Sequence, residues 1–102
     1  MKMTDDELIF QYLVYFTARN VTNKRLRMAA TEENKILNNK ITSKFLDLEN
    51  KLSFRKIKLT HTTRKIGDMM CYSVFKNGWR QEHEISIKDV KEATSKVINE
   101  ER

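Results

Sequence analysis

The first half of the chain carries hydrophobic residues at the spacing of amphipathic helices. Thr4, followed by acids up to Glu7, has the spacing of a capping box, in which a hydroxyl and a carboxylate three residues later satisfy free backbone N–H groups. This pattern predicts a helix from Thr4 to about Arg19. Its apolar face consists of Leu8, Ile9, Tyr12, Leu13 and Phe16.

Further apolar residues lie off that face, so the first helix is apolar nearly all round. Such a helix is either central to the core or shared with a partner. If the helix is shared with a partner, we expect a homodimer with Phe10 and Val14 at its interface.

Residues 22–52 predict two more helices. A helix start at Thr22 or Asn23 predicts a short basic helix from Lys24 to Ala30. Thr31, followed by two acids, is typical of a further amino terminus. The apolar residues that follow recur at steps of three and four: Leu37, Ile41, Phe45, Leu48 and Leu52. One continuous helix over residues 23–52 is the alternative, since no glycine or proline interrupts it.

After Ser53 the pattern changes to the alternation of β-strands. Gly67-Asp68 and Asn77-Gly78 are predicted as two-residue hairpin turns, because glycine and asparagine tolerate positive φ. These turns predict a register in which Thr63, Tyr72 and His83 lie opposite one another, as do His61, Val74 and Gln81. The register sorts most apolar residues onto one face of the sheet.

A closing helix is predicted from Ser86 or Lys88, with a stripe of Val90, Ala93, Val97 and Ile98. The expected fold class is therefore α+β, in one domain over residues 1–102. Two or three amino-terminal helices and the closing helix pack on one face of a three-stranded antiparallel meander.

The charge is unevenly distributed along the chain. The net charge is +6, but residues 19–65 hold thirteen Lys or Arg and four Asp or Glu, a net +9, which leaves −3 for the rest. A polyanionic partner is expected from this asymmetry. The acidic start and the short apolar run Leu8–Phe16 indicate neither a signal peptide nor a membrane span, so a cytoplasmic protein is expected.

Few residues suggest reaction chemistry. Cys71 is the single cysteine, and the predicted register points it away from both His61 and His83. The sequence has neither a glycine-rich phosphate loop nor a metal-binding spacing. We therefore expect a non-enzymatic protein with no cofactor and no metal.

Three helices followed by a hairpin with a basic tip resemble the winged helix-turn-helix family over roughly residues 5–76. The resemblance implies DNA rather than RNA as the partner, and a small transcriptional regulator as the role. It places Asn38, Asn39, Thr42 and Ser43 at the bases, and Lys35, Lys40, Lys44, Arg64 and Lys65 on phosphates. Lys24, Arg25 and Arg27 of the short helix extend this basic surface.

A protein-interaction module is the second hypothesis, such as an inhibitor or adaptor. It would use the first helix or the region of Met69, Met70 and Trp79, since these residue types suit adaptable apolar contacts. Short chains rich in lysine and asparagine and free of proline also resemble small proteins of phages and archaeal viruses.

Overall fold

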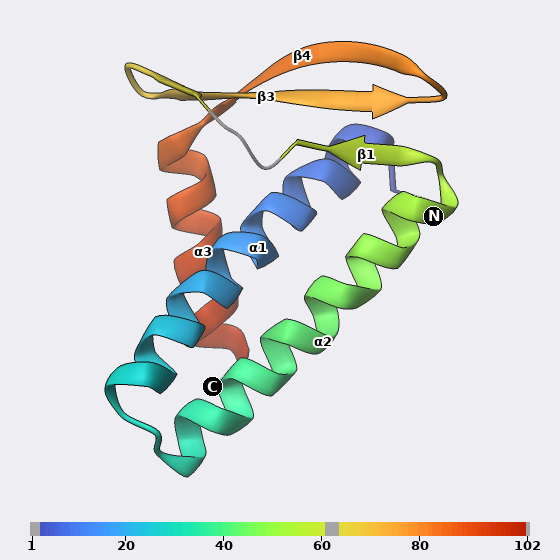
Figure 1. Cartoon of the computed structure of the whole chain (residues 1–102). Coiled ribbons are helices and arrows are strands. Elements are labelled where there is room, and N and C mark those ends of the chain that lie inside the picture. Colours follow the sequence, from blue (N-terminus) through green and yellow to red (C-terminus); the bar gives the residue numbers. More distant parts are fainter. Residues whose placement is uncertain (1–2, 61–63, 102) are drawn as a thin grey trace.

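Three helices lie side by side under one face of an antiparallel sheet in the computed structural model of the chain, which describes residues 3–60 and 64–101 (Figure 1). This arrangement confirms the predicted α+β class. The elements in chain order are α1 (Asp5–Met28), α2 (Glu32–Phe54), β1 (Ile57–Leu59), β2 (Arg64–Ile66), β3 (Met69–Lys76), β4 (Trp79–Ser86) and α3 (Ile87–Glu101).

The first helix is longer than predicted. Thr4 caps it, since the Thr4 hydroxyl accepts a hydrogen bond from the Glu7 N–H at 3.1 Å, but α1 continues past Arg19 to Met28. The separate helix expected from Lys24 to Ala30 is wrong: residues 24–28 form the end of α1, and Ala29 is its C-cap. Thr22 does not cap a new helix, because its buried hydroxyl donates to the Arg19 carbonyl within the same helix at 3.1 Å.

The next boundary confirms the prediction for Thr31. Its hydroxyl accepts a hydrogen bond from the Asn34 N–H at 3.2 Å, and Glu32 and Glu33 lie in the first turn of α2. The alternative of one helix over 23–52 is therefore wrong. The five predicted apolar residues of α2, from Leu37 to Leu52, are all buried.

The sheet is built around β3. β4 pairs with the whole of β3 on one side, while β1 and β2 pair with its two halves on the other. Both predicted turns are confirmed, with positive φ at Gly67, Asn77 and Gly78. The predicted three-stranded meander thus has its first strand divided into two.

The register is confirmed where Tyr72 lies opposite His83 and Val74 opposite Gln81. On the other side of β3, however, Val74 faces Leu59 and not His61. Burying Leu59 needs no polar partner, whereas a buried imidazole would. The slip of two residues leaves the same side chains on the helix-facing side, because side chains alternate with a period of two. His61 and Thr63 themselves lie outside the described residues.

α1 forms the centre of the core, packed between α2 and α3 (Figure 1). One cluster joins α1 and α2 to the sheet, and a second joins Ala18 of α1 to Leu37, Ile41 and Ile98. Val14 is only 3% exposed and therefore cannot provide the expected dimer contact, and Phe10 is itself half-buried. The excess apolar surface of the first helix is covered within the monomer, since α3 packs on that side.

The closing helix begins where predicted. The Ser86 hydroxyl accepts a hydrogen bond from the Asp89 N–H at 3.3 Å, and α3 starts at Ile87.

None of the helices in the described part of the chain combines the length and the hydrophobicity that a membrane span requires.

Asp5 ties the start of α1 to the end of α2 and to the sheet. Its carboxylate accepts a hydrogen bond from Arg55 at 2.9 Å and another from Lys76. The hydrogen bond from Lys76, followed by that from Arg55, holds the pKa of Asp5 below its usual value.

We predict that Asp5→Asn lowers the free energy of unfolding by about 1 kcal/mol at neutral pH, as expected for a partly exposed carboxylate with two partners. Because the folded state lowers the pKa of Asp5, this contribution is complete above the unfolded pKa near 3.8. It disappears as the pH falls through the folded pKa. Urea denaturation at a series of pH values measures the difference. Asp6→Asn is the matched control, since Asp6 lies in the same helical turn without an ion pair among the described residues. An equal loss for both variants would contradict the role given to Asp5.

Candidate nucleic-acid interface

The predicted site residues on α2 differ in their exposure to solvent and in their contacts within the protein. Asn39, Lys40 and Ser43 are exposed, and Thr42 is half-buried. Lys44 is bound to the Glu101 carboxylate of α3, and this hydrogen bond raises the pKa of Lys44. Lys44 is therefore engaged within the monomer.

Asn38 joins the two long helices. Its side-chain amide donates hydrogen bonds to the Thr22 hydroxyl at 2.9 Å and to the side-chain oxygen Oδ1 of Asn23 at 2.7 Å, both on α1. Both donors of the amide are thus used inside the protein. The expectation that Asn38 addresses bases is corrected accordingly. Lys35, three residues earlier, lies on the same side of α2 and is exposed beside the end of α1.

The end of α1 next to this bridge is basic. Arg27 lines a shallow hollow together with Asn20, Asn23 and Leu26. Lys24 is exposed and shares a face of α1 with Asn20, four residues earlier. Lys24 and Arg27 are three residues apart on α1, and the start of α2, which carries Lys35, contacts the end of α1 through the hydrogen bond from the Asn34 amide to the Ala29 carbonyl.

A groove lies between α1 and α3. It is lined by Thr17, Val21 and Arg25 of α1 and by Lys91, Thr94, Ser95, Ile98 and Asn99 of α3. The Nη1 atom of Arg25 is buried without a hydrogen-bond partner among the described residues. A buried guanidinium N–H without an acceptor is costly, so an anionic oxygen in this groove would stabilise it.

Lys91 also lines a second groove, at the start of α3. There it lies with Lys65, Lys88 and Ile87, and with two acids, Asp68 and Glu92. Lys65 pairs with Met70 and so points to the helix-facing side of the sheet. Arg64 pairs with Cys71 on the opposite side and is separated from this groove.

The two grooves together connect both ends of the molecule. In Figure 1 the turn after β2 lies at the top, the connection between α1 and α2 lies at the bottom, and α3 runs between these ends. We call the resulting surface the basic face, and it consists of Lys24, Arg25, Arg27, Lys35, Lys65, Lys88 and Lys91.

Few carboxylates neutralise the basic face. Lys88 lies 4.0 Å from Glu92, but within residues 3–60 and 64–101 the other six cations have no carboxylate within ion-pair distance. Sequence reasoning missed Lys88 and Lys91. Their spacing of three, with Ser95 four residues after Lys91, could have identified a polar side of α3.

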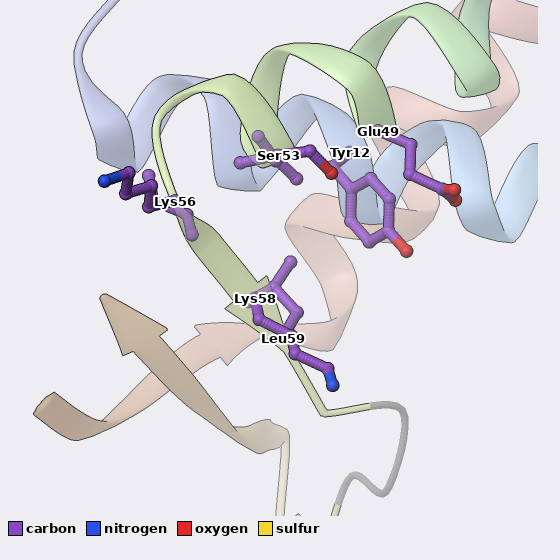
Figure 2. Close-up of a pocket in the computed structure, with 8 residues that line it drawn as sticks. Tyr12, Glu49, Ser53, Lys56, Lys58 and Leu59 are labelled. Atoms are coloured by element: carbon purple, nitrogen blue, oxygen red, sulfur yellow. The ribbon is translucent and has the colours of Figure 1, made fainter. Parts of the chain in front are cut away.

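A different hollow lies between the end of α2 and β1, where Tyr12, Glu49, Ser53, Lys56, Lys58 and Leu59 surround it (Figure 2). Burial, and the Glu49 carboxylate to a smaller degree, raise the pKa of Tyr12, so its hydroxyl stays protonated at neutral pH. Glu49 is the single carboxylate among the residues that line this hollow.

Cys71 and His83 point to opposite sides of the sheet, as predicted. Cys71 lies opposite Glu84, while His83 stacks on Tyr72 with ring centroids 5.7 Å apart. Across the described part of the chain, no three His, Cys, Asp or Glu residues gather as metal ligands would. Comparisons with models of protein families, with curated proteins and with solved structures find no match to the chain.

We predict that Asn38→Ala lowers the free energy of unfolding by about 1–2 kcal/mol, because it leaves the buried Thr22 hydroxyl without its donor. Urea denaturation measures the loss. Asn39→Ala is the matched control, since the exposed Asn39 should change stability by less than about 0.5 kcal/mol. A role in base contact would give the reverse result for Asn38: weaker DNA binding with unchanged stability.

Proposed function

We propose that the protein binds nucleic acid, with duplex DNA as the expected partner, by holding the phosphate backbone against the basic face. The observation that carries this proposal is a set of six cations on α1, α2, α3 and β2 that have no ion pair with any residue in 3–60 or 64–101. Cations without local carboxylates retain their full attraction for phosphates, and binding releases the counterions of the nucleic acid.

The dimensions of the basic face suit a phosphate chain. α3 has fifteen residues, which corresponds to about 22 Å at 1.5 Å per residue. A strand of duplex DNA advances about 3.4 Å per phosphate, so this length spans roughly six phosphates. The number of unpaired cations is of the same order.

The neutral polar groups on this surface are suited to hydrogen bonds with the nucleic-acid backbone and not to the recognition of particular bases. Thr17, Ser95 and Asn99 line the groove around Arg25, and hydroxyl and amide groups commonly bond phosphate and sugar oxygens. We therefore propose binding with little sequence preference. It does not depend on base contacts from the predicted third helix, because the amide of Asn38 is bonded to Thr22 and Asn23 of α1.

The adaptor hypothesis has less support from the geometry. Met69 and Met70 are half-buried at one end of β3, whereas Trp79 lies beside Lys76 at its other end. Seven residues of strand separate them by roughly 23 Å. The three residues therefore do not form a single patch.

A salt titration tests the proposed function. Binding of labelled duplex DNA should weaken with a slope of about −5 in log K against log[salt], for five to six phosphate contacts. Lys91→Ala and Lys24→Ala should each reduce the magnitude of the slope by about 1. The matched control is Lys96→Ala: Lys96 is an exposed lysine of the same helix that does not line either groove.

Equal effects of Lys91→Ala and Lys96→Ala would show that net charge alone drives binding, which contradicts the basic face. Binding that is absent or insensitive to salt would contradict the function itself.

A further inference from the structure

The two edges of the sheet are built differently. The edge opposite β4 is divided into β1 and β2, two strands of three residues whose registers against β3 differ by two. Short strands and register breaks prevent pairing with another chain. β4 instead runs for eight residues in one unbroken register, from Ser86 opposite Met69 to Trp79 opposite Lys76.

The β4 edge lacks several of the usual protections against strand pairing: it has no proline, no bulge and no inward-pointing charge, since its helix-facing side carries Trp79, Gln81, His83 and Ile85. Its charged residues, Arg80, Glu82 and Glu84, lie on the opposite side and include both signs. Within the described residues, β4 pairs only with β3. Figure 1 shows β4 as the outermost strand of the sheet.

The exposed end of β4 is also apolar on the side where the sheet meets the helices. Trp79 pairs with Lys76, and Lys76 reaches down to Asp5, so the Trp79 side chain leaves the sheet on the helix-facing side. It is nevertheless 76% exposed. A tryptophan buries about 150–250 Å² when it is covered, so two copies of Trp79 would contribute a large part of a small interface.

We propose that two copies of the chain associate through β4, pairing antiparallel about a two-fold axis at Gln81 to form one sheet across both copies. Such an interface uses the same patch on each copy, as two-fold dimers do. This association goes beyond nucleic-acid binding and uses no residue of the basic face.

Charge selects this register. A two-fold axis perpendicular to the sheet keeps each face on its own side, so only registers that differ by two residues are allowed. Within one copy, Arg80 already pairs with Glu82 at 2.8 Å. With the axis at Gln81, Arg80 of each copy also lies opposite Glu82 of the other, so the two intrachain pairs combine into a group of alternating charges across the strands. With the axis at Arg80, the Arg80 residues of the two copies would lie opposite each other. With the axis at Glu82, the two Glu82 residues would do so, and in both cases like charges would meet.

The helix-facing side fits the same register. Trp79 of each copy would lie opposite His83 of the other, and His83 already stacks on Tyr72 with the rings 17° apart. The second tryptophan would thus extend an existing aromatic stack. Glu84 would lie opposite Gly78 of the second copy, where no charge meets it.

Charge reversal tests both the surface and the register. The wild-type chain should sediment as a dimer at micromolar concentrations. Arg80→Glu and Glu82→Arg should each weaken dimerisation by about tenfold or more, because each places like charges opposite one another twice. An equimolar mixture of the two variants should restore a heterodimer, since each variant then meets the opposite charge. Glu84→Arg is the matched control and should leave the dimer unchanged.

Circular dichroism of each variant separates loss of pairing from loss of folding. In a Cys71→Ser background, Gln81→Cys should oxidise to a linked dimer, because position 81 faces itself, and Glu84→Cys should not. A wild-type chain that stays monomeric, or a dimer that neither reversal weakens, overturns the proposal. Because these measurements contain no nucleic acid, their failure leaves the proposed function unaffected.

Discussion

The burial of α1 between α2 and α3 is the constraint on which the other features depend. Leu8, Tyr12 and Leu13 pack toward α2 and the sheet, while Val14 lies on another side of the helix and is equally buried. Because apolar residues are buried on several sides of α1, a narrow strip of the helix is exposed to solvent and carries its polar and charged residues. Asn20, Lys24 and Arg27 occupy that strip at helical spacing. The position of the basic face thus follows from how the core is packed.

Ion pairing is distributed unequally over the molecule. At the sheet end, Arg55 and Lys76 share Asp5, and Arg80 lies 2.8 Å from Glu82. Arg55 and Lys76 join different elements through Asp5, whereas the Arg80–Glu82 pair lies within β4. Along the basic face, the acids Glu32 and Glu33 lie in the first turn of α2, where they stabilise the helix amino terminus and do not pair with the neighbouring cations among the described residues. Lys44 and Glu101 likewise join α2 to α3. Cations that join elements thus differ from most cations of the basic face, which have no ion pair among the described residues.

Features that depend on local chemistry could be predicted from the sequence. The caps at Thr4, Thr31 and Ser86 each need one hydroxyl at the right offset, and the two turns need residues that tolerate positive φ. These signals are complete within four residues, so tertiary packing did not override them.

Features that depend on distant partners could not be predicted in this way. Thr22 has the residue type of a helix cap, but its hydroxyl is buried against Asn38, sixteen residues away, and α1 continues through it. The prediction that Asn38 contacts bases failed for the same reason. The sequence reveals that Asn38 is polar, but it does not reveal that its hydrogen-bond partners lie on α1. Lys91 belongs to a part of the chain with net negative charge, so only the packing of α3 on α1 brings it beside Arg25.

The side chain of Trp79 points to the helix-facing side of the sheet but is not buried there. Strand alternation correctly predicted that it leaves the sheet on the same side as Tyr72 and Val74, which are buried. Alternation fixes only the direction of a side chain, whereas burial requires an element beneath it. The described elements do not cover Trp79 in one copy of the chain, since it is 76% exposed while Val74, a few residues along the paired strand, is 3% exposed. An inward-facing tryptophan left uncovered on an unprotected edge strand is the feature of this fold that a second copy would complete.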